Sequence, residues 1–352
     1  MNDDFNRIKP EETEGIKKTE KNSLAGTAAL TVLLSLLTVL PSLNIFSTAT
    51  ELVAIALFAN MTAVRRTPAA AYISTVISAV ASILITKSVF AGLVPVLAVC
   101  VVGTAAALCI KKKAGLVVSS AIIAATFIFM TAVPFAIGVY MVYGSVIGGI
   151  RTYFSQIFDE AASIMKNSFD AAGVPVQYET VRAMFSEAAM LLPGMIVAVA
   201  EVFGGLIYIG SYLISRFRRI DVREFYPKGL EVVLGTEPAV FFIVTTVFTL
   251  IVSNFKSANV LFYALMNLLI ILILPMIVYG VYIMIKKLVT PRPVIKMENG
   301  MEYRPAGFSF LWIVVPLLIL NFPMALLITA FYGAFQAISK NKKNRDEKEN
   351  KQ

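Results

Sequence analysis

The chain has 352 residues, of which 58% are hydrophobic and only 15% are charged. Soluble globular proteins carry charge on about a quarter of their residues, so this composition excludes an ordinary water-soluble fold. The net charge of +9 comes from basic residues scattered over many short connectors, and this scatter does not predict nucleic-acid binding.

Nine long apolar runs follow one another along the chain. A bilayer core about 30 Å thick needs about 20 helical residues, and a helix that faces lipid excludes charge. All 31 Lys and Arg residues lie outside the runs, and of the 22 acidic residues only Glu51 and Glu201 lie inside. We therefore expect an all-α, polytopic transmembrane helical bundle with eight or nine spans. The runs cover residues 24–43, 47–64, 68–86, 89–110, 115–145, 190–215, 238–254, 259–285 and 308–338.

Basic residues in the connectors predict the orientation. One alternate set of connectors, beginning with the N-terminal tail, holds twenty Lys and Arg residues, and the other set holds five. Because cytoplasmic loops carry the excess of Lys and Arg, the N-terminus is expected in the cytoplasm, in a bacterial cytoplasmic membrane. The charged tails, 1–22 and 339–352, are low in apolar content and are expected to be disordered. The transmembrane domain between them covers 23–338.

The last run leaves two topologies open. Residues 308–338 are too long for one untilted span and too short for two full spans, and Asn321 and Pro323 interrupt them. A broken helical hairpin that enters from the cytoplasmic side would keep the basic C-terminal tail inside. A single ninth span with an external tail is the alternative.

The long connector at 146–189 is expected outside the cell. Its apolar residues recur at helical spacing on either side of Gly173 and Pro175, which predicts two amphipathic helices. These helices either lie on the membrane surface or cover the bundle as a lid, or they simply pack against the bundle.

Glu201 is the strongest candidate for a functional residue. An ionised carboxylate in the middle of a span costs several kcal/mol unless it is paired, hydrated or protonated. Helical spacing places it on a stripe of small and polar residues that should face protein or a cavity. The stripe contains Gly194, Ala198, Gly205, Tyr208 and Tyr212. Glu201 is either a contact for a cation, proton or substrate, or a protonated acid hydrogen-bonded to a neighbouring helix.

Three further residues are candidates for ligand or ion binding: Glu51, Asn60 and Asn267. Glu51 lies near the outer end of the second run, where the headgroup level is an alternative explanation. The asparagines lie within apolar runs, and hydrogen bonds between helices would explain them equally well, as they would Asn321.

No catalytic residue, metal site or cofactor site is expected. The chain has no histidine and no phosphate-binding or hydrolase motif, so it is not expected to be an enzyme or to drive transport with ATP. Cys100 and Cys109 lie in the fourth run without a CxxC pattern and are expected to behave as small apolar residues.

The order of the segments carries a resemblance. A tight pair of runs around Pro41 ends at Arg65-Arg66, and a later span lies between Leu191-Leu192-Pro193-Gly194 and Arg216-Phe217-Arg218-Arg219, followed by Arg223-Glu224-Phe225. This layout resembles the YybS-like membrane proteins of Gram-positive bacteria, a family of unknown function.

The first six spans of that family look like the substrate-binding components of energy-coupling-factor vitamin transporters. In those components small residues on the first span dock the coupling subunit, and Ala25-xxx-Ala29 is a candidate match. The two or three additional runs of this chain depart from that pattern.

The expected function is therefore a transport-related membrane component without its own ATPase. The alternative is a scaffold or interaction protein of the cell envelope, and a membrane-embedded enzyme comes third. The lipid bilayer and other membrane proteins are the expected partners, and the sequence indicates no particular small-molecule substrate.

Overall fold

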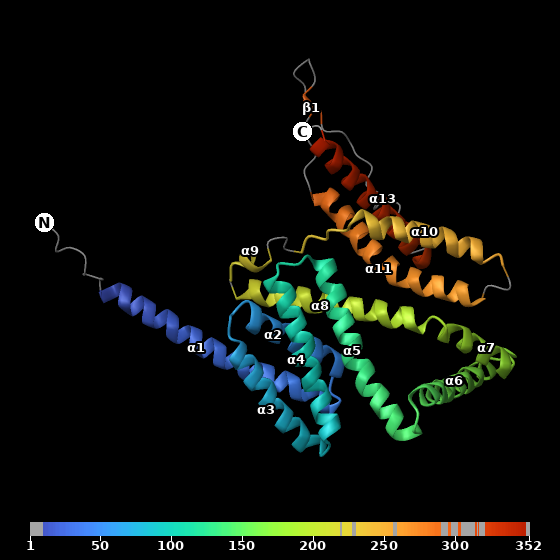
Figure 1. Cartoon of the computed structure of the whole chain (residues 1–352), viewed down its shortest axis with the longest axis horizontal. Helices are drawn as coiled ribbons and strands as arrows, with labels where there is room; N and C mark the ends of the chain where they lie inside the picture. Colours follow the sequence, from blue (N-terminus) through green and yellow to red (C-terminus); the bar gives the residue numbers. More distant parts are fainter. Residues whose placement is uncertain are drawn as a thin grey trace. The chain divides into compact units, whose positions relative to one another are not determined.

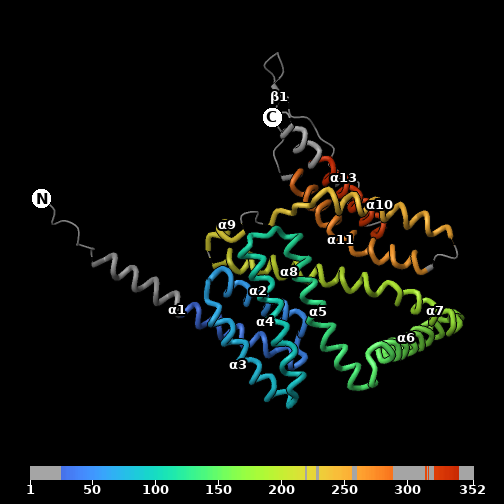
Figure 2. Tube along the Cα trace, in the orientation of Figure 1, coloured from blue at the N-terminus to red at the C-terminus, as the bar shows by residue number. Residues whose placement is uncertain are grey.

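The computed structural model is built almost entirely of helices (Figures 1 and 2). It describes residues 10–218, 220–226, 230–255, 259–289, 295–296, 302–303, 314, 316 and 321–349. The expected all-α class is confirmed for this part of the chain, in which the only strands are β1 (Ile295–Lys296) and β2 (Glu302–Tyr303), paired antiparallel.

The helices follow the order of the predicted runs. They are α1 (Pro10–Val39), the short 3-10 helix η1 (Leu40–Leu43), α2 (Ser47–Ala63), α3 (Pro68–Thr86), α4 (Val89–Lys111), α5 (Leu116–Tyr143), α6 (Val146–Ala171), α7 (Tyr178–Ala189), α8 (Leu192–Phe217), α9 (Val222–Phe225), α10 (Thr236–Val252), α11 (Asn259–Val289) and α13 (Phe322–Glu349).

Seven helices in the described ranges are long and apolar enough to cross a membrane, so the chain is a polytopic helical membrane protein. Helices α2 and α10 have 17 residues each, which is at the lower limit for a span. The seven stretches are Ala25–Leu43, Pro68–Thr86, Val89–Lys111, Leu116–Tyr143, Leu192–Phe217, Val260–Lys287 and Phe322–Lys340.

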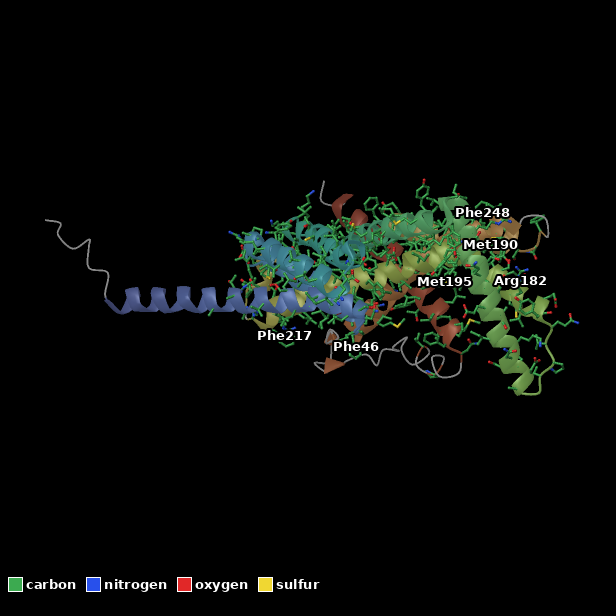
Figure 3. The ribbon with its side chains drawn as sticks, turned by 90° about the horizontal axis from the view of Figure 1, so that it is seen from below. Phe46, Arg182, Met190, Met195, Phe217 and Phe248 are labelled. Carbon is green, nitrogen blue, oxygen red and sulfur yellow. The ribbon has the colours of Figure 1, made fainter. Side chains whose placement is uncertain are left out.

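Helix α3 shows most clearly that the surroundings are lipid. Its polar residues Ser74, Thr75, Ser78 and Ser82 are at most 1% exposed, whereas its aliphatic residues point outward, with Leu84 72% exposed. In water the two faces would be reversed. Figure 3 shows the same preference elsewhere, with apolar side chains such as Phe46, Phe217 and Phe248 on the outside.

The chain packs into two compact units. The first unit consists of residues 1–135 and 201–230, and the second consists of 136–200 and 231–352. The sequence analysis treats 23–338 as one domain, because nothing in the apolar pattern marks a boundary inside α5 or α8. The division appears only once it is known which helices pack together.

Helix α2 forms the core of the first unit. Every residue from 54 to 64 is buried, and α2 packs against α1, α3 and α4. Close approach depends on glycine, since a Cβ on Gly103 of α4 would overlap the ring of Phe58. A serine pair joins α1 to α3, with Ser78 Oγ donating to the Ser35 carbonyl oxygen at 3.1 Å.

In the second unit α10, α11 and α13 lie side by side. Helices α11 and α13 approach with their backbones in contact, because a Cβ on Gly333 would overlap the carbonyl oxygen of Met276, and one on Gly280 that of Thr329. At one end of this pair the Lys287 ammonium donates to the Tyr332 hydroxyl at 2.9 Å. The sequence analysis did not single out this glycine pair.

Helix continues where the sequence predicted disorder. Helix α1 begins at Pro10, inside the tail 1–22, and α13 extends to Glu349, inside the tail 339–352. Pro10 followed by Glu11 and Glu12 is a favourable helix start, and adding a residue to an existing helix avoids the unfavourable nucleation step. The expectation that the two tails are disordered stays a prediction.

The expected break in the last run is present at Asn321. Its side chain caps α13, accepting from the Met324 backbone N–H at 3.2 Å, so a helix does begin where the interruption was placed. The hairpin and the single span differ in the segment before Asn321, which is mostly outside the described residues.

Substituting Gly333 with leucine tests the backbone contact in the second unit. We expect Gly333→Leu to destabilise the protein by roughly 1–3 kcal/mol, because Met276 and its helix must shift. Gly138→Leu is the matched control, since a Cβ there meets no atom within 4 Å. Thermal unfolding in detergent measures the difference, and equal melting temperatures for the two variants would contradict the packing.

Candidate functional site

Asn60 joins α2 to α8 inside the first unit. Its side chain is 0% exposed, and its amide nitrogen donates to Ser215 Oγ at 2.6 Å and to the Ser211 carbonyl oxygen at 3.2 Å. One turn earlier on α2, the Cβ of Ala56 lies 3.2 Å from the position that a Cβ would take on Gly210. The two helices therefore run parallel and in contact, and the predicted hydrogen bond between helices is confirmed for Asn60.

The same end of α8 holds a buried group of tyrosines. Tyr226, which is 2% exposed, packs edge to face against Tyr208 and Tyr212 and shares a 3.0 Å hydrogen bond with the Ser211 hydroxyl. Burial raises the pKa of Tyr226, and its hydrogen bonds with Ser211 and Ser215 lower it to a smaller extent, so the phenol stays neutral. The sequence analysis missed Tyr226 because it lies outside the apolar runs.

Glu201 lies where α8 meets α5. Its carbonyl oxygen accepts a hydrogen bond from Ser120 Oγ at 2.5 Å, and a Cβ on Gly204 would overlap the Ser120 carbonyl oxygen. The Glu201 side chain is half-buried. Among the described residues its carboxyl group has no hydrogen bond or ion pair, so the expected alternative of an acid bonded to a neighbouring helix is not seen there.

The predicted stripe through Glu201 turns away from lipid. Gly194 and Tyr208 are buried and the other members are half-buried. On the opposite side of α8, Val199 is 51% exposed and Leu206 is 50% exposed. The prediction that this face contacts protein or a cavity is confirmed by the burial of its residues.

Glu51 lies on α2 in the same half of the first unit. Glu51 lies about 21 Å from Arg65 along the axis of α2, at 1.5 Å per residue. On the same measure, Glu201 lies about 26 Å from Arg218 along the axis of α8. Because α2 and α8 run parallel, these two acidic residues lie at similar depths on neighbouring helices. Like Glu201, Glu51 is half-buried and has no hydrogen-bond partner in the part of the chain that the structure describes.

Asn267 has a structural role in the second unit. Its side-chain oxygen accepts from the Gly194 N–H at 2.6 Å, and its amide nitrogen donates to the carbonyl oxygens of Met190 at 2.6 Å and Tyr263 at 2.9 Å. It thereby satisfies an N–H of the first turn of α8, where helices leave such groups unpaired. The alternative prediction of a hydrogen bond between helices is confirmed for Asn267.

The helices α6 and α7 form the predicted pair between 146 and 189, joined through Gly173. They pack on each other through stacked Phe158 and Phe185 rings, 6.5 Å apart. Arg182, labelled in Figure 3, pairs with Asp159 at 2.6 Å. Both residues line a cavity of about 560 Å³ between the two helices.

No cluster of three or more His, Cys, Asp or Glu residues that could hold a metal ion occurs in the described ranges. Cys100 and Cys109 are free thiols, and Cys100 lies 3.1 Å from the Thr75 hydroxyl.

Comparison with known proteins found no matching family model, no matching curated protein and no matching solved structure. The chain is a multi-pass membrane protein. Its candidate site consists of Glu201 and Glu51, since Asn267 is occupied in packing and Asn60 is held to α8 by its amide nitrogen, although the Asn60 side-chain oxygen is buried without a partner in the described part of the chain.

A double-mutant cycle tests the role of Asn60. We expect Asn60→Leu and Ser215→Ala each to destabilise the protein, with a coupling energy of about 1 kcal/mol, the scale of hydrogen bonds between membrane helices. Unfolding of the four proteins in detergent gives this energy. A matched cycle pairs Asn60→Leu with Ser145→Ala, just before α6, where no coupling energy is expected. Additive effects in both cycles would contradict the hydrogen bond between α2 and α8.

Proposed function

We propose that the chain is a transport-related component of a bacterial cytoplasmic membrane, without an ATPase of its own, and that Glu201 provides its cation or proton contact. The observation that carries this proposal is the half-buried Glu201 carboxyl group without a described partner. A carboxylate at that depth is unfavourable unless it serves a ligand, water or a proton. Glu51, at similar depth on the parallel helix α2, is the second contact.

The placement of basic residues supports a cytoplasmic N-terminus. Arg65 and Arg218 approach the same glycine, Gly26, while Arg66, Lys111 and Lys113 line one cavity. The ends of α2, α4 and α8 therefore lie on one side of the first unit, together with the start of the first span. This is the arrangement that the positive-inside rule requires for six alternating crossings.

The resemblance of the segment order to YybS-like proteins, and of its first six spans to substrate-binding components, agrees with this proposal. Six predicted crossings, α1 to α5 and α8, contribute to the first unit. On this proposal α2 and α10 also cross the bilayer, which gives eight or nine spans. The two or three runs that follow α8 are the additional part of the chain, which departs from the pattern of the vitamin transporters.

Scaffolding is the second candidate, and the hairpin of α6 and α7 favours it. Ile164 is 61% exposed and Met184 is 60% exposed, so the hairpin has an exposed apolar surface that a partner could cover. It carries three basic and five acidic residues, and a net negative charge disfavours attachment to anionic lipid. A protein partner is the better occupant of this surface.

Thermal unfolding with a panel of cations tests the role of Glu201. We expect one of H⁺, Na⁺, K⁺, Li⁺ or Mg²⁺ to raise the melting temperature of the purified full chain, because a ligand that binds only the folded state stabilises it. Glu201→Gln should remove this shift, and Glu51→Gln should weaken it. Glu187→Gln, on the exposed surface of α7, is the control and should keep it. A shift that persists in Glu201→Gln would exclude Glu201 as the contact.

Purification from native membranes distinguishes the two classes. We expect mild detergent to recover the tagged chain with ATPase subunits and a coupling membrane subunit, identified by mass spectrometry. Recovery of cell-wall or division proteins, lost when Ile164 and Met184 are both replaced by serine, would instead establish the scaffold. Recovery of the chain alone would contradict both complexes and leave a stand-alone carrier.

A further inference from the structure

Two arginines from distant parts of the sequence meet over one point of α1. The Nη2 atom of Arg65 and the Nη1 atom of Arg218 lie 3.4 Å and 3.7 Å from the position that a Cβ would take on Gly26. Arg65 is the second residue after the end of α2, and Arg218 is the first residue after the end of α8. The parallel packing of α2 and α8 therefore brings the two guanidinium groups together.

This pair of like charges has no described counter-charge. Partial burial lowers the pKa of Arg65, and the positive charge of Arg218 lowers it further, because two cations close together disfavour each other's charged form. The hydrogen-bond partner of the Arg65 side chain is the neutral hydroxyl of Thr27, at 3.4 Å. Among the described residues no carboxylate forms an ion pair with Arg65 or Arg218.

The acidic residue that lines a hollow together with Arg65 is already engaged. Glu224 of α9 pairs with Arg66 at 3.2 Å, so it does not separate Arg65 from Arg218. Both partners of this ion pair are mostly exposed, and such pairs contribute little stability. An anion of higher charge would interact more strongly with this group of cations than Glu224 does.

Two hollows with shared walls adjoin these side chains. One, of about 430 Å³, is lined by Thr27, Arg65 and Arg66, and the other, of about 460 Å³, is lined by Arg66, Lys111 and Lys113. Both include Glu224 and Phe225. The walls thus contain four basic side chains, one acidic side chain, three threonine side chains and one aromatic ring.

We propose that this basic cluster, formed by Arg65, Arg66, Lys111, Lys113 and Arg218, binds a phosphate group. Guanidinium groups hold phosphate oxygens with two parallel hydrogen bonds, which a lysine does not reproduce. A phosphate between Arg65 and Arg218 would convert their repulsion into two attractions.

The phosphate belongs either to an anionic lipid headgroup or to a soluble phosphorylated molecule. Diffuse attraction between basic loops and anionic lipid depends on the number of charges. The affinity of a specific phosphate site depends in addition on the planar, two-pronged geometry of the guanidinium groups. Exchanging arginine for lysine separates these two cases, because the charge stays the same.

The first experiment compares two double variants of the full chain in detergent. Arg65→Lys/Arg218→Lys alters the pair of arginines that meet beside Gly26. Arg216→Lys/Arg223→Lys is the matched control, because these two exposed arginines lie at the same end of the unit, line neither hollow and are not among the atoms nearest to Gly26. Titration with inorganic phosphate, against chloride at equal ionic strength, is followed by thermal unfolding. We expect the cluster variant to bind about tenfold more weakly, because both guanidinium groups with their paired hydrogen bonds are replaced by ammonium groups of the same charge. The control should bind as the unchanged protein does.

The second experiment identifies the source of the phosphate. The same proteins in nanodiscs of phosphatidylcholine, with and without phosphatidylglycerol, are titrated with phosphate. A lipid headgroup in the site would make phosphatidylglycerol stabilise the unchanged protein and compete with phosphate, with both effects reduced in the cluster variant. A soluble ligand would leave phosphate binding the same in both membranes.

Equal phosphate and phosphatidylglycerol binding by the cluster variant and the control would overturn the proposal. Size-exclusion profiles of both double variants establish that they are folded. The outcome is independent of the cation experiments on Glu201, because that residue lies about 26 Å along α8 from Arg218 at 1.5 Å per residue.

Discussion

Hydrocarbon offers no hydrogen-bond partner, so each polar group within a span must be satisfied inside the protein or serve a function. This constraint explains why Ser74 and Ser78 of α3 face inward while Leu84 faces outward. It also explains the amide nitrogen of Asn60, which donates to Ser211 and Ser215 of α8, and Asn267, which fixes the start of that helix. The side-chain oxygen of Asn60 is an exception, because it is buried without a described partner. The same constraint makes Glu201 informative, because its carboxyl group has no such partner among the described residues.

Satisfying polar groups in this way requires helices to come very close. Glycine permits this at Gly204, against α5, and at Gly280 and Gly333, where α11 and α13 touch with their backbones. Without a hydrophobic force between spans, such contacts supply much of the attraction between membrane helices. Both units therefore contain helices that pack closely at glycines, and this close packing holds the polar side chains in place.

The two proposed sites of the first unit lie at two levels. Parallel packing of α2 and α8 sets Glu51 and Glu201 at similar depths within the span region, and it brings Arg65 and Arg218 together at the basic end. The proposed cation contact and the proposed phosphate site therefore depend on one helix pair. Asn60 lies between the two levels, and its hydrogen bonds to Ser211 and Ser215 fix the register of that pair.

The sequence alone determined the membrane location, the helical class, most helix boundaries and the two helices between 146 and 189, because these follow from composition and local periodicity. It also identified Glu201 as unusual, since a carboxylate in an apolar run is visible without a fold. Only the tertiary structure showed that Asn60 and Asn267 are occupied by neighbouring helices, that Gly333 contacts Met276, and that Arg65 meets Arg218. Each of these facts depends on which helices are neighbours and in what register, and a pattern confined to one apolar run carries no information about its partner.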